Sequence, residues 1–341
     1  MRAPLPAEPI ATCDACVMLP PSGEIQASEH FNPATKCCAY IPTLHNYLVG
    51  GVLGERDPAM AEGRARVAAA VDARIGVTPM GIVPPSQFAL LYGPDRFGQS
   101  ETLRCPYYIQ ERGQCGVWKH RNAVCSTWFC KHARGATSRA FWKAIEIALG
   151  EVERAVARSV VLELDVGAEA LAALFPHPAD VKGSAADLDR RVDEARYARL
   201  WGNWLGRERA FYEQAAALVA RLGRDDALRL GGSEVAARVK VARDAFAALG
   251  DEALPARLRL GELQIVAMDE ARTRVTTYSP YDPIDLPPAL VSVLHRFNGT
   301  PTKKVLAVIR QEDGLELDAA LVRKLVDFEV LVAEGKHAEA Q

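Results

Sequence analysis

The sequence predicts a mainly α-helical protein with three structured parts: an irregular cysteine-rich domain, a helical middle region and a small winged-helix-like C-terminal domain. Three observations lead to this prediction. All eight cysteines lie within the first 130 of 341 residues. Residues 136–255 carry apolar side chains at helical spacing. Residues 260–335 contain both strand-like and helix-like segments.

The order of these segments gives the expected domain organisation. Residues 1–12 are rich in Pro and Ala, which is typical of a flexible tail. Residues 13–135 hold the cysteines and form the expected metal-binding domain. Residues 136–255 form the helical region, and residues 260–335 form the winged-helix-like domain.

Composition narrows the function classes. The net charge is −2, which gives no general attraction to nucleic acid or to an anionic membrane. Residues 1–10 contain Pro4, Pro6 and Pro9 and lack the apolar core of a signal peptide. No apolar run is long enough for a membrane span. We therefore expect a cytoplasmic protein without a membrane partner. In that reducing compartment cysteines bind metal or do redox work more often than they form disulfides, although disulfides and unrelated thiols remain alternatives.

The N-terminal cysteines form two pairs. Cys13 and Cys16 have CxxC spacing, which lets both sulfurs reach one metal ion and also occurs in redox pairs. Cys37 and Cys38 are adjacent. Neighbouring side chains of an extended chain point to opposite sides, so we expect this pair to serve two metals or two edges of one cluster.

The second group of cysteines has the spacing C-x9-C-x9-C-x4-C over residues 105–130. Gly113 and Gly116 flank Cys115 and allow the backbone to approach sulfur closely. Five aromatic residues either exclude water from a metal site or form the core of a small domain: Tyr107, Tyr108, Trp118, Trp128 and Phe129. The candidate metal ligands are therefore all eight cysteines: Cys13, Cys16, Cys37, Cys38, Cys105, Cys115, Cys125 and Cys130. Four histidines near them are secondary candidates, namely His30, His45, His120 and His132.

The cysteine pattern resembles a known family. CxxC, then CC, then C-P-Y-Y, G-x-C-x-x-W-x-x-R and a further Cys is similar to the YkgJ-type cysteine-cluster proteins. The resemblance covers residues 10–135 and implies chelation of zinc or iron. A more distant similarity to flagellin lysine-N-methylases shares the CC and cysteine-cluster pattern, but we find no Gly-rich loop for S-adenosylmethionine.

Periodicity predicts the elements that follow. Helices are expected over residues 40–55, 57–75 and 137–157, with a turn-rich crossing over 76–100. A helical stretch over 185–222 is expected to break at Gly202 and Gly206, and a further helix follows Ser233. This region carries no catalytic motif, so the sequence names no reaction.

The C-terminal part predicts strands over 263–267 and 274–278, three short helices and a closing strand over 330–332. It resembles PqqD-like peptide-recognition modules, which implies a protein or peptide partner. Residues 285–335 contain six Lys or Arg against eight Asp or Glu, a balance that disfavours nucleic acid.

These observations lead to three functional hypotheses. The first is a protein that holds an iron–sulfur cluster or zinc through thiolates, with a redox role or a role in peptide or protein modification. The alternative is a zinc-structured interaction scaffold without catalysis. A metal-sensing DNA-binding regulator is disfavoured by charge.

Overall fold

The computed structural model describes residues 5, 7–8, 13, 15–19, 30–93, 97–177 and 189–335. The chain divides into two compact units, which are described separately. Unit 1 comprises Met1–Ala11, Phe129–Ala144 and Val241–Gln341, and unit 2 comprises Thr12–Trp128 and Ile145–Lys240. The expected flexible tail lies outside the described residues, except for residues 5, 7 and 8.

The prediction of a mainly α protein is confirmed, with thirteen α-helices among the described residues and strands of only two to five residues. The two longest helices, α5 (Gly135–Glu163) and α11 (Gly232–Leu249), each begin in one unit and end in the other. The expected helical region, 136–255, is therefore divided between the units. Within the described ranges, no helix combines the length and apolarity needed to cross a membrane.

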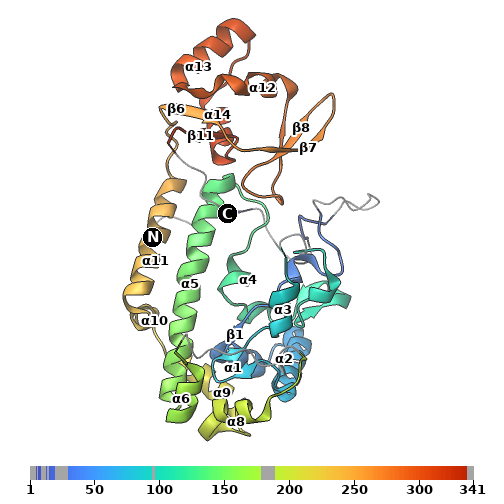
Figure 1. The fold of residues 1–341 in the computed structure, drawn as a ribbon, viewed down its shortest axis with the longest axis vertical. Helices are drawn as coiled ribbons and strands as arrows, with labels where there is room; N and C mark the ends of the chain where they lie inside the picture. The colour runs from blue at the N-terminus through green and yellow to red at the C-terminus, as the bar shows by residue number, and fades with distance from the viewer. Residues whose placement is uncertain are drawn as a thin grey trace. The chain divides into compact units, whose positions relative to one another are not determined.

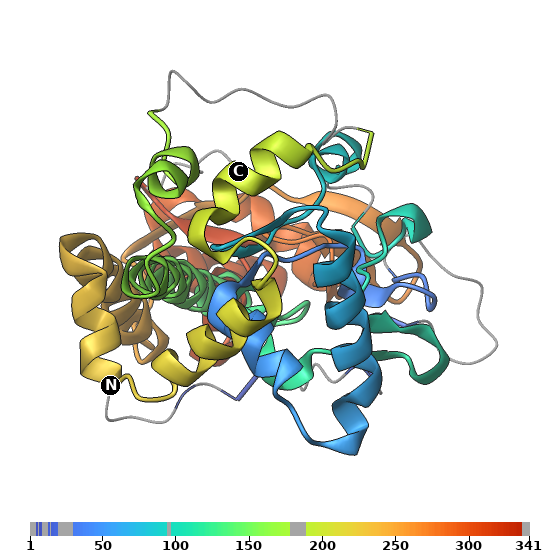
Figure 2. The same ribbon diagram turned by 90° about the horizontal axis from the view of Figure 1, so that it is seen from below.

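Unit 2 contains most of the helices around a small antiparallel sheet. The sheet has the order β1 (Leu44–His45), β3 (Gly81–Ile82) and β2 (Val77–Thr78). Helices α1 and α9 cross closely at Gly50, where an added Cβ would lie 1.8 Å from the carbonyl oxygen of Tyr212; Figure 2 shows α9 in yellow across α1 in blue. The helices wholly within this unit are α1 (Asn46–Leu53), α2 (Ala61–Ala73), α3 (Ser86–Leu91), α4 (Ala123–Thr127), α6 (Ala168–Leu174), α8 (Glu194–Trp201), α9 (Glu208–Val219) and α10 (Arg224–Leu230).

Unit 1 contains two three-stranded antiparallel sheets. In the first, β6 (Arg257–Leu260) pairs with β10 (Asn298–Pro301) and β11 (Leu331–Ala333). In the second, β8 (Thr273–Thr276) lies between β7 (Gln264–Met268) and β9 (Ile284–Leu286). Figure 1 shows the helices of this unit around the first sheet: α12 (Pro288–Val293), α13 (Thr302–Val308) and α14 (Ala319–Asp327).

Most of the predicted long elements are confirmed. The stretch 185–222 breaks at Gly202 and Gly206, both with positive φ, into α8 and α9. Asp318 caps α14, since its Oδ1 accepts the Leu321 N–H at 2.7 Å. The expected strands over 263–267, 274–278 and 330–332 correspond to β7, β8 and β11.

Candidate metal centre

The adjacent pair Cys37 and Cys38 lies in a 3₁₀ turn, Lys36–Cys38, rather than in extended chain. In a 3₁₀ turn, adjacent side chains do not point to opposite sides of the chain. The Cys37 and Cys38 thiols form a hydrogen bond with each other. The expectation that the two side chains point to opposite sides is therefore wrong. Lys36 begins the turn at φ 50°, in the left-handed region.

Cys105 and Cys115 are positioned by a short hairpin. The Cys105 N–H donates to the Cys38 carbonyl at 2.6 Å, which joins the second cysteine group to the first. Cys115 lies on β5 (Gln114–Cys115), which pairs with β4 (Tyr108–Ile109), and Gly113 makes the turn at φ 61°. The hairpin thus holds Cys115 beside the Cys37–Cys38 turn.

Cys125 lies in the first turn of α4. Asn122 caps this helix, because its Oδ1 accepts the Cys125 N–H at 3.1 Å. The same side chain donates from Nδ2 to the Thr43 carbonyl at 3.1 Å. One asparagine therefore fixes Cys125 to the chain segment that enters β1.

The first two cysteines reach the same neighbourhood. The backbone N–H of Cys115 donates to the Cys13 thiol, and that of Met18 donates to the Cys16 thiol. The Lys36 ammonium donates to the carbonyls of Cys13 and Gly113. This buried lysine therefore ties the N-terminal cysteine segment to the β4–β5 hairpin.

Seven thiols consequently interact with one another within unit 2, and we call them the thiol cluster: Cys13, Cys16, Cys37, Cys38, Cys105, Cys115 and Cys125. The eighth, Cys130, is a buried residue of unit 1. None of the eight forms a disulfide. In the described part of the chain, no three Cys, His, Asp or Glu side chains are already arranged as ligands of one metal ion.

The electrostatics of the thiol cluster combine burial with two nearby cations. Burial raises the pKa of Cys115 to about 11 and that of Cys125 to about 12, and it also raises the pKa of Cys105 well above its ordinary value. The hydrogen bond from the Cys38 thiol lowers the pKa of Cys37, and the charges of Arg121 and Lys36 act in the same direction. A thiolate forms most readily at Cys37.

Arg121 leaves a hydrogen-bond donor unused beside the thiols. Its guanidinium stacks on the Trp118 ring at 3.6 Å from the centroid. Its Nε is buried and has no hydrogen-bond partner among the described residues. Because a buried donor without a partner is costly, this atom fits an anionic group, such as a thiolate bound to metal, at the cluster.

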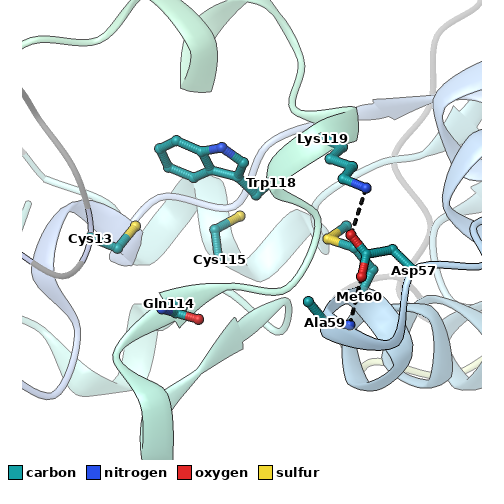
Figure 3. A pocket seen from close by; sticks show the side chains of 8 residues that line it. All are labelled: Cys13, Asp57, Ala59, Met60, Gln114, Cys115, Trp118 and Lys119. Atoms are coloured by element: carbon teal, nitrogen blue, oxygen red, sulfur yellow. Dashed lines mark hydrogen bonds and ion pairs between the residues drawn. The ribbon is translucent and has the colours of Figure 1, made fainter.

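A pocket of about 370 Å³ opens beside the thiol cluster (Figure 3). Cys13 and Cys115 line it below the Trp118 indole, and the Asp57–Lys119 ion pair, 2.7 Å between Oδ2 and Nζ, lines another side. Met60, Ala59 and Gln114 complete the lining. The cluster is therefore accessible to small molecules from this side.

The four candidate histidines have different surroundings. His120 Nε2 lies 3.2 Å from Glu55, and His45 Nε2 lies 4.0 Å from Glu153. His132 belongs to unit 1, where its Nδ1 lies 3.3 Å from the Tyr278 hydroxyl. His30 Nδ1 is buried without a hydrogen-bond partner among the described residues. None of these contacts is to a cysteine.

Sequence reasoning missed several residues of the site. Lys36 and Asp57 carried no recognisable signal, because a lysine before a cysteine pair and a distant aspartate are ordinary surface residues in most sequences. The aromatic residues that were expected to exclude water or to form a core differ in exposure. Tyr107 and Tyr108 are buried, whereas Trp118 and Trp128 are 40% and 37% exposed.

Comparisons with known proteins find no matching family model, no matching curated protein and no matching solved structure.

Proposed function

We propose that the chain holds an iron–sulfur cluster or zinc through thiolates of the thiol cluster. One observation carries this proposal: seven thiols from separate chain segments interact with one another without forming disulfides. Cysteines that serve only as small core residues need not converge in this way. Soft thiolates that meet at one place suit zinc and iron–sulfur clusters alike.

The charge balance of the site supports the proposal. Four thiolates around a zinc ion, or around a [4Fe–4S] core, carry a net charge of about −2. Lys36 and Arg121 supply two cations beside the thiols, and the Arg121 Nε has an unused donor. Hydrogen bonds and charges of this kind stabilise thiolate-bound centres.

The two metals imply different activities. An iron–sulfur cluster would supply electron transfer, for redox chemistry or for modification of a peptide or protein, whereas zinc would stabilise the fold or polarise a bound group. The chain's own contribution is to bind the centre, to neutralise it with Lys36 and Arg121, and to exclude water with the buried rings of Tyr107 and Tyr108. Such thiols stay reduced in the cytoplasm, which is the location we propose.

The test is to purify the full chain without oxygen and to measure iron, sulfide and zinc. Brown protein with iron and sulfide supports a cluster, and colourless protein with stoichiometric zinc supports a zinc centre. Cys38→Ser should lower the metal content sharply, whereas Ser126→Ala, an exposed neighbour of Cys125, should leave it unchanged. Wild-type protein without either metal, even after reconstitution, would overturn the proposal.

The adjacent cysteines allow a finer comparison. If Cys37 and Cys38 serve different metals, or different edges of one cluster, Cys37→Ser and Cys38→Ser should lose different fractions of the metal. Equal losses from the two variants would count against this division.

A second function, peptide or protein interaction, is favoured by one observation in unit 1. Strand β7 is the edge of its sheet and is exposed along its whole length, with Ile265, Val266 and Met268 each about half exposed or more. An exposed apolar edge strand can pair with a partner segment. We propose that the winged-helix-like segment, 260–335, acts in this way.

This second proposal has its own test. A partner peptide should protect the β7 amides from hydrogen exchange, and Val266→Pro should abolish the protection, because proline removes a backbone donor. Protection that persists in Val266→Pro would contradict pairing at this edge.

A further inference from the structure

We infer that the partner of strand β7 is an extended apolar segment with a basic residue at each end, carried by a different protein and not by a second copy of this chain. This inference rests on the proposed pairing at β7 and adds the chemistry of the partner to it.

The first observation is the composition of β7. Its five residues, Gln264–Met268, carry no charge, and all of them are exposed. Strand β8 pairs with one edge of β7, and among the described residues no strand pairs with the other edge (Figure 1). An extended apolar segment can therefore bind through backbone hydrogen bonds and cover exposed side chains such as Met268, which is 74% exposed.

The second observation is a carboxylate at each end of this uncharged strand. Glu262 is exposed two residues before β7. Glu270 is exposed in the turn that follows β7, where the Asp269 N–H donates to the Arg272 carbonyl at 2.9 Å. In the described part of the chain, neither Glu262 nor Glu270 has a hydrogen bond or an ion pair. Both carboxylates are therefore available to a partner.

The cations of the β7–β8 hairpin do not neutralise these two carboxylates. Arg272 Nη1 lies 2.8 Å from Asp285 Oδ2, and Arg274 Nε lies 2.7 Å from Asp285 Oδ1. Asp285 belongs to β9, which pairs with β8 on the side away from β7. Arg272 also lies 3.5 Å from Asp269. The two ends of β7 therefore keep negative charge, which favours a partner segment with Lys or Arg at both ends.

The same charges act against pairing of β7 with β7 of a second copy. Antiparallel pairing that aligns all five residues places Val266 opposite Val266, and it places Glu262 of each copy beside the acidic turn of the other. Like charges that face each other across paired strands are destabilising. Charged residues at an edge strand protect many proteins against association with themselves in this way. The partner is therefore a different chain with basic ends.

The experiment uses the full chain and two peptides with blocked termini that differ only in charge, KKVTVTVKK and EEVTVTVEE. Hydrogen exchange of the β7 amides locates the binding, and fluorescence anisotropy of the labelled peptides measures its strength. The basic peptide should protect the β7 amides and bind about tenfold more tightly, because it forms ion pairs where the acidic peptide is repelled. Added salt should reduce this difference by screening the charges.

Charge-reversal variants complete the test. Glu262→Lys combined with Glu270→Lys should reverse the preference, so that the acidic peptide binds about tenfold more tightly than the basic one. Glu252→Lys combined with Glu316→Lys is the matched control. It makes the same change in net charge at exposed positions of unit 1 outside the hairpin, and it should bind both peptides like wild type.

The outcomes distinguish this inference from the proposed pairing. Equal binding of both peptides at β7, or a preference that the charge reversal leaves unchanged, would overturn the inference about charge and leave the pairing in place. Absence of β7 protection by either peptide would overturn both. Protection of β7 that increases with protein concentration without peptide would identify a second copy as the partner and would also overturn this inference.

Discussion

Gly63 packs directly against the backbone of the segment that follows Cys115. It lies in α2, and a Cβ added there would lie 1.7 Å from the carbonyl oxygen of Gly116, which follows β5. The obstacle is backbone rather than a flexible side chain, so the hairpin would have to move. The close contact of these two glycines thus keeps α2 against the segment that holds Cys115.

Gly63→Ala should therefore lower the free energy of unfolding by about 2–3 kcal/mol, the cost of forcing extra volume into a packed contact. It should also reduce the metal content. Gly150 in α5 has nothing within 4 Å of its added Cβ, so Gly150→Ala should instead stabilise the protein by about 1 kcal/mol. Urea unfolding of both variants checks the two signs, and a Gly63→Ala protein as stable as wild type would contradict this account.

At the residue scale, the cysteine spacing indicated that thiols from the two groups come together, as seven of the eight do, but it gave no sign of the side chains around them. Cysteine spacing is a direct signal of shared ligands. The geometry at Cys37 and Cys38 was not predictable in the same way, because it depends on a left-handed Lys36 whose ammonium is bound by two distant carbonyls. Such contacts arise from the tertiary fold and leave no local pattern in the sequence.

At the scale of elements, β1 and the unit 2 part of α5 present a largely buried pair of titratable groups. His45 on β1 and Glu153 on α5 lie 4.0 Å apart, between Nε2 and Oε2. Burial lowers the pKa of His45 to about 4 and raises that of Glu153 to about 7. Between these values both groups are neutral in the folded protein.

The two groups have opposite effects on stability. His45 has a lowered pKa, so its contribution is complete above pH 6.5 and is lost as pH falls toward 4. Glu153 has a raised pKa, so its contribution is complete below pH 4.5 and is lost as pH rises toward 7. In the wild-type protein, the rise in stability with pH that His45 causes and the fall that Glu153 causes largely cancel between pH 4.5 and 6.5.

Replacing one residue of the pair at a time should reveal the effect of the other residue on how the free energy of unfolding changes with pH. His45→Gln should become less stable as pH rises from 4.5 to 7, by about 3 kcal/mol, because only Glu153 then titrates. Glu153→Gln should become more stable as pH rises from 4 to 6.5, by a similar amount. Urea unfolding across this range measures both, and slopes of the same sign in the two variants would contradict the assignment.

Elements were predictable in proportion to their length. The apolar stripe of α5 extends over many turns, and the sequence indicated it clearly. Strands β6, β9 and β10 have only three or four residues and form through pairing with distant segments, as β6 does with β10 and β11. Helices α3 and α10 were not predicted because they are also short: six or seven residues contain too few apolar repeats to show a helical pattern.

At the scale of the whole molecule, each unit has a hydrophobic core of its own. The core of unit 2 is built around Trp201, Phe211 and Tyr212, and that of unit 1 around Leu258, Phe297 and Leu325. Both units are assembled from separated stretches of the chain. In unit 1, for example, the Arg134 Nε donates to Asp327 at 2.8 Å across 193 residues. Composition along the chain could not predict this interleaving, because it reports only on neighbours in sequence.

Separate cores lead to a prediction about metal removal. Thiolate ligands must lose their protons and converge when the centre forms, so its binding free energy also stabilises the surrounding fold. The cysteines lie on very short elements, such as the turn Lys36–Cys38 and the two-residue strand β5, which have little stability of their own.

Chelation should therefore speed amide hydrogen exchange in residues 30–60 and 105–128 of unit 2. The amides of β6, β10 and β11 in unit 1 should keep their protection and serve as the internal control. Cys38→Ser should show the same pattern without chelator, because it removes a ligand rather than the metal supply. An equal rise in exchange across both units would show that metal supports the whole chain and would contradict the independence of the two cores.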